Sequence, residues 1–233
     1  MIAIMKREIN SYFNSAIGYV YLTVFYLFSG LQLFGLVSEQ SSDLRIIFAG
    51  YYGILMLIVP LLTMRLFSDE KKMKTDQALL TSPISVNAVV YGKFIAAMII
   101  FFIGIAITIP YAIVLNIFGD VNWLRFFGNL VGITLLGGAM ISIGIFFSSL
   151  TESQIIAAIT TFGMLFFLLL LEVFSMLINN PLIQTVANGL AFNPKYEEFT
   201  FGVFTLAGIL FFLSIIAVMN FCTFRVIEKK RWS

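Results

Sequence analysis

The side chains that could do chemistry are few, and the densest group of them lies in one loop. The chain of 233 residues contains no His and a single cysteine, Cys222. It therefore has no His for acid–base catalysis or for activating a Ser nucleophile, and it lacks a Cys cluster for zinc. The feature that remains is the charged loop over residues 67–93, whose residue types suit contact with a partner or a membrane surface.

A short helix is predicted in this loop. Asp69 and Glu70 suit the positive end of a helix dipole. Pro83 disfavours helical backbone angles at the residue before it, which ends the helix. We therefore expect one helix over residues 69–82. Ser85 can then cap a second helix that runs into the next apolar stretch.

The predicted helix is amphipathic. Met73, Gln77 and Leu80 recur at the spacing of one helix face, with Leu79 alongside, and the opposite face is charged. Such a helix could fit a groove on a cytoplasmic protein. The alternatives are a solvated loop, or a basic patch that lies on anionic lipid.

The rest of the chain is dominated by apolar residues. Hydrophobic residues make up 60% of the chain, charged residues 11%, and the mean hydropathy is +1.00. A spanning helix needs about 20 apolar residues, and the alternation of a barrel strand is absent. These features predict an all-α membrane protein with six transmembrane helices. The predicted spans are 17–37, 50–66, 94–118, 126–148, 154–178 and 202–224.

The distribution of Lys and Arg predicts the orientation. With both termini in the cytoplasm, that side holds two basic residues before the first span, five around the long inner loop and four after the last span. The outer side then holds only Arg45, Arg125 and Lys195. This is the positive-inside bias expected of short loops.

Two further segments flank the predicted spans. Residues 1–16 mix apolar with charged side chains, which predicts an amphipathic helix on the inner membrane surface; the alternative is a short leader that only sets topology. Residues 179–201 are partly apolar and too long for a turn. We expect short re-entrant helices there, in the outer leaflet and covered by protein.

Glu172 is the only acid inside a predicted span. An intramembrane carboxylate is costly, so it should face a transport pathway or a helix partner, or else lie close enough to the interface to be hydrated. Bulky apolar side chains surround it in the same span. They could form a hydrophobic gate or face lipid. These residues are Phe166, Phe167, Leu170 and Phe174.

The fourth predicted span is rich in small residues. Gly128 and Gly132, and then Gly138 and Ser142, are spaced to let another helix approach closely. Close packing within one chain is one interpretation, and a dimer seam is the other. Two prolines inside spans, at positions 60 and 110, are expected to kink their helices.

One run of residues carries a resemblance to a known family. The sequence is similar to the type-2 ABC exporter permeases, and among these to compact bacterial members such as gliding-motility and copper-processing permeases. Two positions depart from the family's pattern, because Lys74 stands where Gly is common and Gln77 stands where Glu is common. The matching run is Pro60-Leu61-Leu62-Thr63-Met64-Arg65-Leu66-Phe67-Ser68-Asp69-Glu70-Lys71, then Thr75, Leu79-Leu80 and Ser82-Pro83-Ile84.

The resemblance implies a membrane subunit of an ATP-driven exporter in a bacterial cytoplasmic membrane. Such a subunit pairs with a second copy or a paralogue and binds two separate ATPase subunits through a coupling helix, here residues 69–82. It has no enzyme activity or cofactor of its own, because the chain lacks a phosphate-binding Gly-x-x-x-x-Gly-Lys-Ser/Thr loop; ATP and Mg belong to the partner. The implied ATPase-contact residues are Asp69, Glu70, Lys71, Thr75, Gln77, Leu79, Leu80, Ser82 and Pro83.

The substrate is less defined by these features. A mostly apolar interior favours an amphipathic, lipidic or peptide cargo, and nothing suggests a nucleic-acid partner. The alternative function is an ion- or proton-coupled carrier in which Glu172 is the coupling group. Carriers usually contain inverted repeats and helix breaks at the membrane midplane, and no repeat is visible in this sequence.

Overall fold

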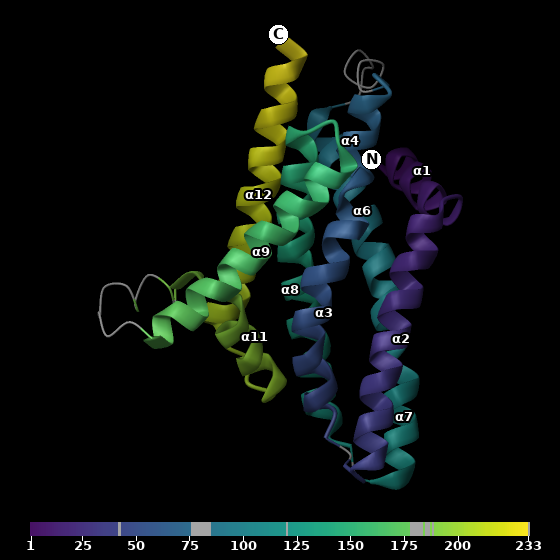
Figure 1. Cartoon of the computed structure of the whole chain (residues 1–233), viewed down its shortest axis with the longest axis vertical. Coiled ribbons are helices and arrows are strands. Elements are labelled where there is room, and N and C mark those ends of the chain that lie inside the picture. Colours follow the sequence, from purple (N-terminus) through teal and green to yellow (C-terminus); the bar gives the residue numbers. More distant parts are fainter. Residues whose placement is uncertain are drawn as a thin grey trace.

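The computed structural model of the chain is a bundle of helices, with no strand among the residues it describes (Figure 1). It describes all residues except 42, 76–84, 120, 178–183, 185–186, 188 and 233. The helices are α1 (Ile2–Phe13), α2 (Ala16–Ser38), α3 (Arg45–Thr63), α4 (Arg65–Lys72), α6 (Val86–Ile105), α7 (Thr108–Phe118), α8 (Trp123–Leu150), α9 (Gln154–Leu177), α11 (Phe192–Thr200) and α12 (Leu206–Trp232).

Six helical stretches of the described residues are long and apolar enough to cross a membrane, which confirms the predicted number of spans. α3 and α4 together form one of them, and α6 with α7 forms another. Both termini lie at the same end of the bundle, which we call the terminus end (Figure 1). The stretches are Ala16–Ser38, Arg45–Lys72, Val86–Ile117, Trp123–Leu150, Gln154–Phe174 and Leu206–Lys230.

The spans form a centre and a periphery. α3, α4 and α8 are mostly covered by protein, whereas α2, α9 and α12 expose most of their length. α2 and α7 run side by side on one flank, and α9, α11 and α12 occupy the other (Figure 1). α1 packs against α6 and α2 at the terminus end. Apolar exposure on the peripheral helices is expected where lipid or another membrane chain is the neighbour.

Glycines on α8 allow the central helices to touch. A Cβ atom at Gly137 would overlap the ring of Phe101 on α6, and one at Gly144 would overlap the side chain of Thr63 on α3. A Cβ at Gly132 would lie 2.5 Å from Cβ of Phe199, which belongs to α11. These glycines therefore serve close packing within one chain, as the first of the two sequence interpretations predicts.

The break predicted near Pro110 is present. Proline has no N–H to donate to the carbonyl of the residue four positions earlier, and its ring clashes with that carbonyl. The helix accordingly stops at Ile105 and restarts at Thr108. Side chains satisfy the carbonyls at the break, since the Tyr26 hydroxyl donates to Ile103 O at 2.8 Å and Thr108 Oγ1 donates to Ile105 O at 2.8 Å.

Several boundaries differ from the predicted spans. α3 begins at Arg45 rather than at residue 50, and at this start the Asp43 carboxylate accepts the backbone N–H of Arg45 at 3.0 Å. The Arg45 side chain stacks on Phe201 and pairs with Glu197. The helix capped by Ser85 extends the third span towards the terminus end, as expected, and Ser85 Oγ accepts the N–H of Ala88 at 3.4 Å. The described part of the segment 179–201 includes the helix α11, which packs against α3, α8, α9 and α12.

Candidate functional site

A buried lysine stands at the centre of the terminus end. The side chain of Lys93, on α6, is 0% exposed. Its Nζ lies 3.0 Å from Glu8 Oε1 on α1 and 3.1 Å from Glu70 Oε2 on α4, and it donates to Leu66 O at 2.6 Å. An ammonium group has three N–H donors, and here three oxygen atoms surround it. These oxygen atoms compensate the buried charge of Lys93, which would otherwise strongly destabilise the fold.

Arg7 completes the group, which we call the ionic cluster: Arg7, Glu8, Glu70 and Lys93. Arg7 Nη2 lies 2.8 Å from Glu8 Oε1 and also pairs with Glu70. Two cations thus face two carboxylates, and the formal charge of the cluster is zero. Burial alone would raise the pKa of Glu8, but the charge of Lys93 and the hydrogen bonds from Arg7 and Lys93 outweigh it, so the pKa lies below its ordinary value.

Polar side chains also hold the junction between α3 and α4. Ser148 Oγ, on α8, donates to Met64 O at 2.9 Å and accepts the backbone N–H groups of Phe67 at 3.1 Å and Ser68 at 3.3 Å. From the α1 side, the Tyr12 hydroxyl donates to the backbone carbonyl of residue 62 at 2.6 Å. A side chain inserted into the helical ladder is a recognised cause of a helix break, and here it fixes the break in place.

Arg65 and Asp69 add polar contacts to α1 and extend them to α9. Arg65 donates to the hydroxyls of Ser11 and Ser15, at the end of α1 and the turn after it. Its Nε lies 4.0 Å from Asp69 Oδ2. Asp69 in turn accepts a hydrogen bond from the amide of Gln154, the first residue of α9. Side chains of α4 therefore contact α1, α6, α8 and α9.

The predicted helix over residues 69–82 is not observed as one continuous element. α4 begins at Arg65, upstream of the predicted start, and ends at Lys72. Lys74 then has a left-handed backbone with φ of 56°. The N–H of Thr75 donates to Glu70 O at 2.9 Å, and the N–H of Lys74 donates to Lys71 O at 3.1 Å. This pair of bonds is a Schellman motif, which terminates a helix.

The predicted ATPase-contact residues separate into two sets. Asp69 and Glu70 point into the chain, as described above, and Lys71 Nζ donates to the carbonyl of Ser149 on α8. Thr75 Oγ1 donates to the carbonyl of residue 70 at 3.3 Å, which helps to close the turn. The second set lies outside the described residues, so its placement stays a prediction. It comprises Gln77, Leu79, Leu80, Ser82 and Pro83.

The outward-facing residues of this turn are different ones. Lys72, Met73 and Lys74 are exposed, and Met73 has 72% of its surface exposed. A cavity of about 340 Å³ lies beside Met73 and Thr75 and reaches the ionic cluster. The turn thus presents an apolar tip between two lysines while its base is held by buried polar contacts.

Sequence reasoning selects only Glu70 of the ionic cluster as a site residue. It treats Arg7 and Lys93 as charges that set the orientation, and Glu8 as part of an amphipathic segment. A signal was available for Glu8, because Ile4, Glu8 and Tyr12 share one helix face at i, i+4 and i+8, and all three are buried. An acid on the buried face of a helix requires a cationic or hydrogen-bonding partner. No comparable signal selects Ser148 or Gln154.

The predicted pathway residues lie elsewhere, on α9. Glu172 is buried and accepts a hydrogen bond from Asn193 Nδ2 of α11 at 2.9 Å. Phe166, Phe167 and Phe174 are exposed on α9, and Leu170 is half-buried. None of these side chains belongs to the ionic cluster. Whether the exposed face of α9 lines a pathway stays a prediction.

The fold and the site together define a class. Among the described residues, no three His, Cys, Asp or Glu side chains gather as metal ligands would. Six apolar helices, with an ionic cluster and a charged turn at the terminus end, are the features of a multi-pass membrane protein.

Comparison with protein families identifies the particular kind of transporter. Residues 3–230 match the family described as ABC-2 family transporter protein. The chain therefore belongs to this family and is an ABC permease subunit, and membrane proteins of this family work with ATPase subunits. A search of curated proteins found no match to the chain.

Proposed function

We propose that the chain is the membrane subunit of an ATP-driven exporter, and that the turn after α4 transmits movement from the partner ATPase to the membrane helices. The observation that carries the proposal is the ionic cluster, in which Lys93 joins Glu70 of α4 to Glu8 of α1. A loop that transmits movement must be rigidly attached to the membrane helices. A fully paired ionic network around the buried Lys93 provides such an attachment.

The contacts of α4 support a mechanical role. Consecutive residues of α4 contact different helices: Asp69 contacts α9, Glu70 contacts α1 and α6, and Lys71 contacts α8. A displacement of α4 would therefore be passed to several membrane helices at once. This arrangement suits coupling better than it suits a solvated loop, which would leave these side chains in water.

The docking surface proposed for the ATPase is the outward side of the same turn. Met73 is flanked by Lys72 and Lys74, all exposed. Leu79 and Leu80, which lie outside the described residues, would extend this apolar surface into a groove of the ATPase, as in other helix-in-groove contacts. In this proposal both termini are cytoplasmic, as the Lys and Arg distribution favours.

The proposed assembly has two permeases and two ATPase subunits in a bacterial cytoplasmic membrane. The second permease is another copy or a paralogue. The exposed apolar residues of α9, including Phe166 and Phe174, supply a face that a second membrane chain could cover. The proposed cargo is amphipathic, lipidic or peptide, in keeping with the apolar interior.

The test of coupling uses the double variant Leu79→Asp/Leu80→Asp. The permease is purified with its ATPase, and both co-purification and permease-dependent ATP hydrolysis are measured. We expect the double variant to lose at least about tenfold in one or both, since two buried apolar contacts of the docked state become charged. Lys229→Asp, an exposed position at the same end, is the matched control and should behave like the unmodified protein.

Normal co-purification and normal hydrolysis in the double variant would overturn the docking proposal. Charge reversal at Glu70 is a poor test of docking, because Glu70 faces Lys93 and Arg7 within the chain. A lysine there would place three cations around Glu8, and any loss of hydrolysis would report on the cluster instead.

A further inference from the structure

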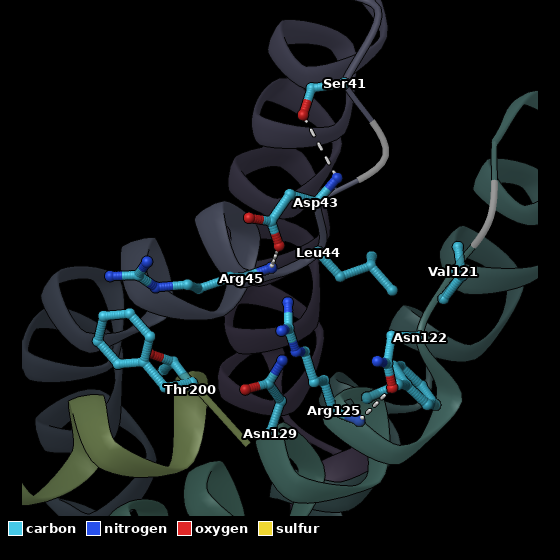
Figure 2. A pocket seen from close by; sticks show the side chains of 11 residues that line it. Ser41, Asp43, Leu44, Arg45, Val121, Asn122, Arg125, Asn129 and Thr200 are labelled. Atoms are coloured by element: carbon cyan, nitrogen blue, oxygen red, sulfur yellow. Dashed lines mark hydrogen bonds between the residues drawn. The ribbon is translucent and has the colours of Figure 1, made fainter. Parts of the chain in front are cut away.

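A second polar cavity lies at the end of the bundle opposite the termini. Its volume is about 550 Å³, and it is bounded by the start of α3, the start of α8 and the end of α11 (Figure 2). Two arginines, Arg45 and Arg125, contribute to its wall. Nothing in the coupling mechanism uses this cavity, which is remote from the ionic cluster.

The Arg125 guanidinium is the cationic group of this cavity that could bind a ligand. Its side chain rises from α8 into the middle of the cavity, with the guanidinium next to the amide of Asn129 (Figure 2). Within the described residues, no ion pair or side-chain hydrogen bond of its guanidinium is found. Arg125 is exposed, and Gly202 lies against its stem: the glycine has φ of 79°, and a Cβ at that position would lie 3.0 Å from Arg125 Cγ.

Arg45 is held at the side of the cavity. Its guanidinium carbon lies 3.5 Å from the centre of the Phe201 ring, and its Nη2 lies 3.3 Å from Glu197 Oε1. The nearby Asp43 carboxylate accepts the backbone N–H of Arg45 at 3.0 Å, so this acid is engaged in capping α3. Among the described residues, Arg125 is therefore the arginine of this cavity that has no ion-pair partner, and the Asp43 carboxylate lines the same cavity.

The backbone adds to the positive potential. α3 and α8 both begin at this cavity, and the N-terminal end of a helix carries a partial positive charge. A guanidinium with its flat array of N–H donors, beside two helix starts, is suited to the oxygen atoms of a phosphate group.

The surroundings of the cavity are apolar. Leu124 and Phe127 on α8 are exposed, at 71% and 58%, and so are Phe201 and Phe204 after α11. A ligand seated here would contact charge at the cavity and hydrocarbon beside it. Free phosphate would use only the first of these surfaces, whereas a phospholipid would use both.

We propose that this cavity binds the phosphate group of an anionic phospholipid, with Arg125 as the principal ligand residue and the acyl chains along the exposed side chains of α8. The proposal does not rest on the exporter function or on the ATPase, so the two can fail separately.

The test is native mass spectrometry of the purified chain with phosphatidylglycerol, with phosphatidylcholine of the same acyl chains, and with inorganic phosphate. We expect phosphatidylglycerol to bind best, and Arg125→Gln to reduce its binding about fivefold, the effect of one basic residue on anionic lipid. Arg225→Gln is the matched control, because Arg225 is an exposed arginine at the terminus end. Because Arg225 is already paired with Glu228, we expect the Arg225→Gln variant to bind phosphatidylglycerol within about twofold of the unmodified chain.

Arg125→Lys, which keeps the charge, separates loss of the site from loss of the fold, and should retain most of the binding. Equal binding of phosphatidylglycerol by Arg125→Gln and the unmodified chain would overturn the proposal, as would equal binding of the two lipids. Binding of inorganic phosphate that displaces phosphatidylglycerol at equal concentration would assign the site to free phosphate and would overturn the lipid assignment.

Discussion

Lys93 and Glu70 lie 3.1 Å apart, Nζ to Oε2, and this pair closes the base of the loop that separates α4 from α6. Glu70 lies two residues before the end of α4, and Lys93 is the eighth residue of α6. Tying the two ends of a loop together restricts the positions that the loop can adopt. The two ends of the loop are therefore fixed relative to one another. A movement imposed on the loop must displace α4 and α6, and with them α1.

Replacing Lys93 by Met should strongly destabilise the protein. The substitution leaves Glu8 and Glu70 buried near one another with only Arg7 to compensate them, and breaking a buried ion pair costs about 3–5 kcal/mol. Thermal unfolding in detergent measures the effect. Lys6→Met, at an exposed position on α1, is the control and should unfold like the unmodified protein.

Removing the two carboxylates as well should recover part of that loss, because the one charge then left, on Arg7, is half-exposed. In a triple variant with Lys93→Met, Glu8→Gln and Glu70→Gln, no buried carboxylate lacks a partner, so its unfolding temperature should exceed that of the single variant. If Lys93→Met unfolds at the same temperature as the unmodified protein, the ionic cluster contributes nothing to stability and does not fix the two ends of the loop.

The ionic cluster should also make stability depend on pH on the acid side. The pKa of Glu8 is lowered in the folded protein, so the folded state binds this proton less readily than the unfolded chain. Its stabilising contribution is complete above the ordinary carboxyl pKa of roughly 4.3 and is lost as the pH falls through the lowered value. Unfolding temperatures measured from about pH 6 to about pH 3.5 should fall more steeply for the unmodified protein than for Glu8→Gln. Parallel curves would exclude Glu8 as the responsible group.

Lys74→Gly should stabilise the turn after α4. Lys74 has φ of 56°, a left-handed conformation that costs a residue with a side chain about 1 kcal/mol or more and that glycine adopts freely. Hydrogen exchange of the backbone amides over residues 70–75 measures the local effect, which should be slower exchange. Lys72→Gly is the matched comparison, because Lys72 is still helical, and it should exchange faster.

The turn after α4 gives a structural reason for the departure from the family's pattern at Lys74. The family resemblance implies Gly at the position of Lys74, and this position is the left-handed residue of a Schellman motif. The prediction of a helix running through it failed because the sequence offered a lysine, a good helix former, at a position where the backbone reverses. The bonds from Thr75 and Lys74 to α4 outweigh that local preference.

The spans were predictable because the length of each apolar run is a strong local signal. The ionic cluster was not, because Glu8, Glu70 and Lys93 come from three separate segments and only the tertiary fold brings them together. The glycines of α8 are an intermediate case. Their spacing predicted a close contact, but the residues that fill it, such as Phe199 opposite Gly132, depend on how the helices cross.

The contact between Gly137 and Phe101 gives a packing prediction. Gly137→Ala would place a methyl group on the Phe101 ring, and overpacking a tight contact costs about 1–3 kcal/mol. Gly163→Ala, on α9, is the matched control because nothing lies within 4 Å of its Cβ position. It should be neutral or slightly stabilising, since alanine favours a helix. Equal unfolding temperatures for the two variants would contradict the packing seen at α8.

Glu172 separates the exporter from the alternative of a proton-coupled carrier. Its carboxylate accepts a hydrogen bond from Asn193, and the amide oxygen of a glutamine in the same place can accept that bond equally well. For a transporter driven by ATP, Glu172→Gln should therefore leave permease-dependent ATP hydrolysis within about twofold, whereas Glu172→Leu should lower the unfolding temperature by removing the acceptor for the partly buried amide of Asn193. A carrier that uses Glu172 to hold a proton would instead lose its activity in the Gln variant, because the amide does not titrate. Solute uptake by the purified chain alone, driven by a pH gradient and abolished by Glu172→Gln, would favour the carrier and count against the exporter.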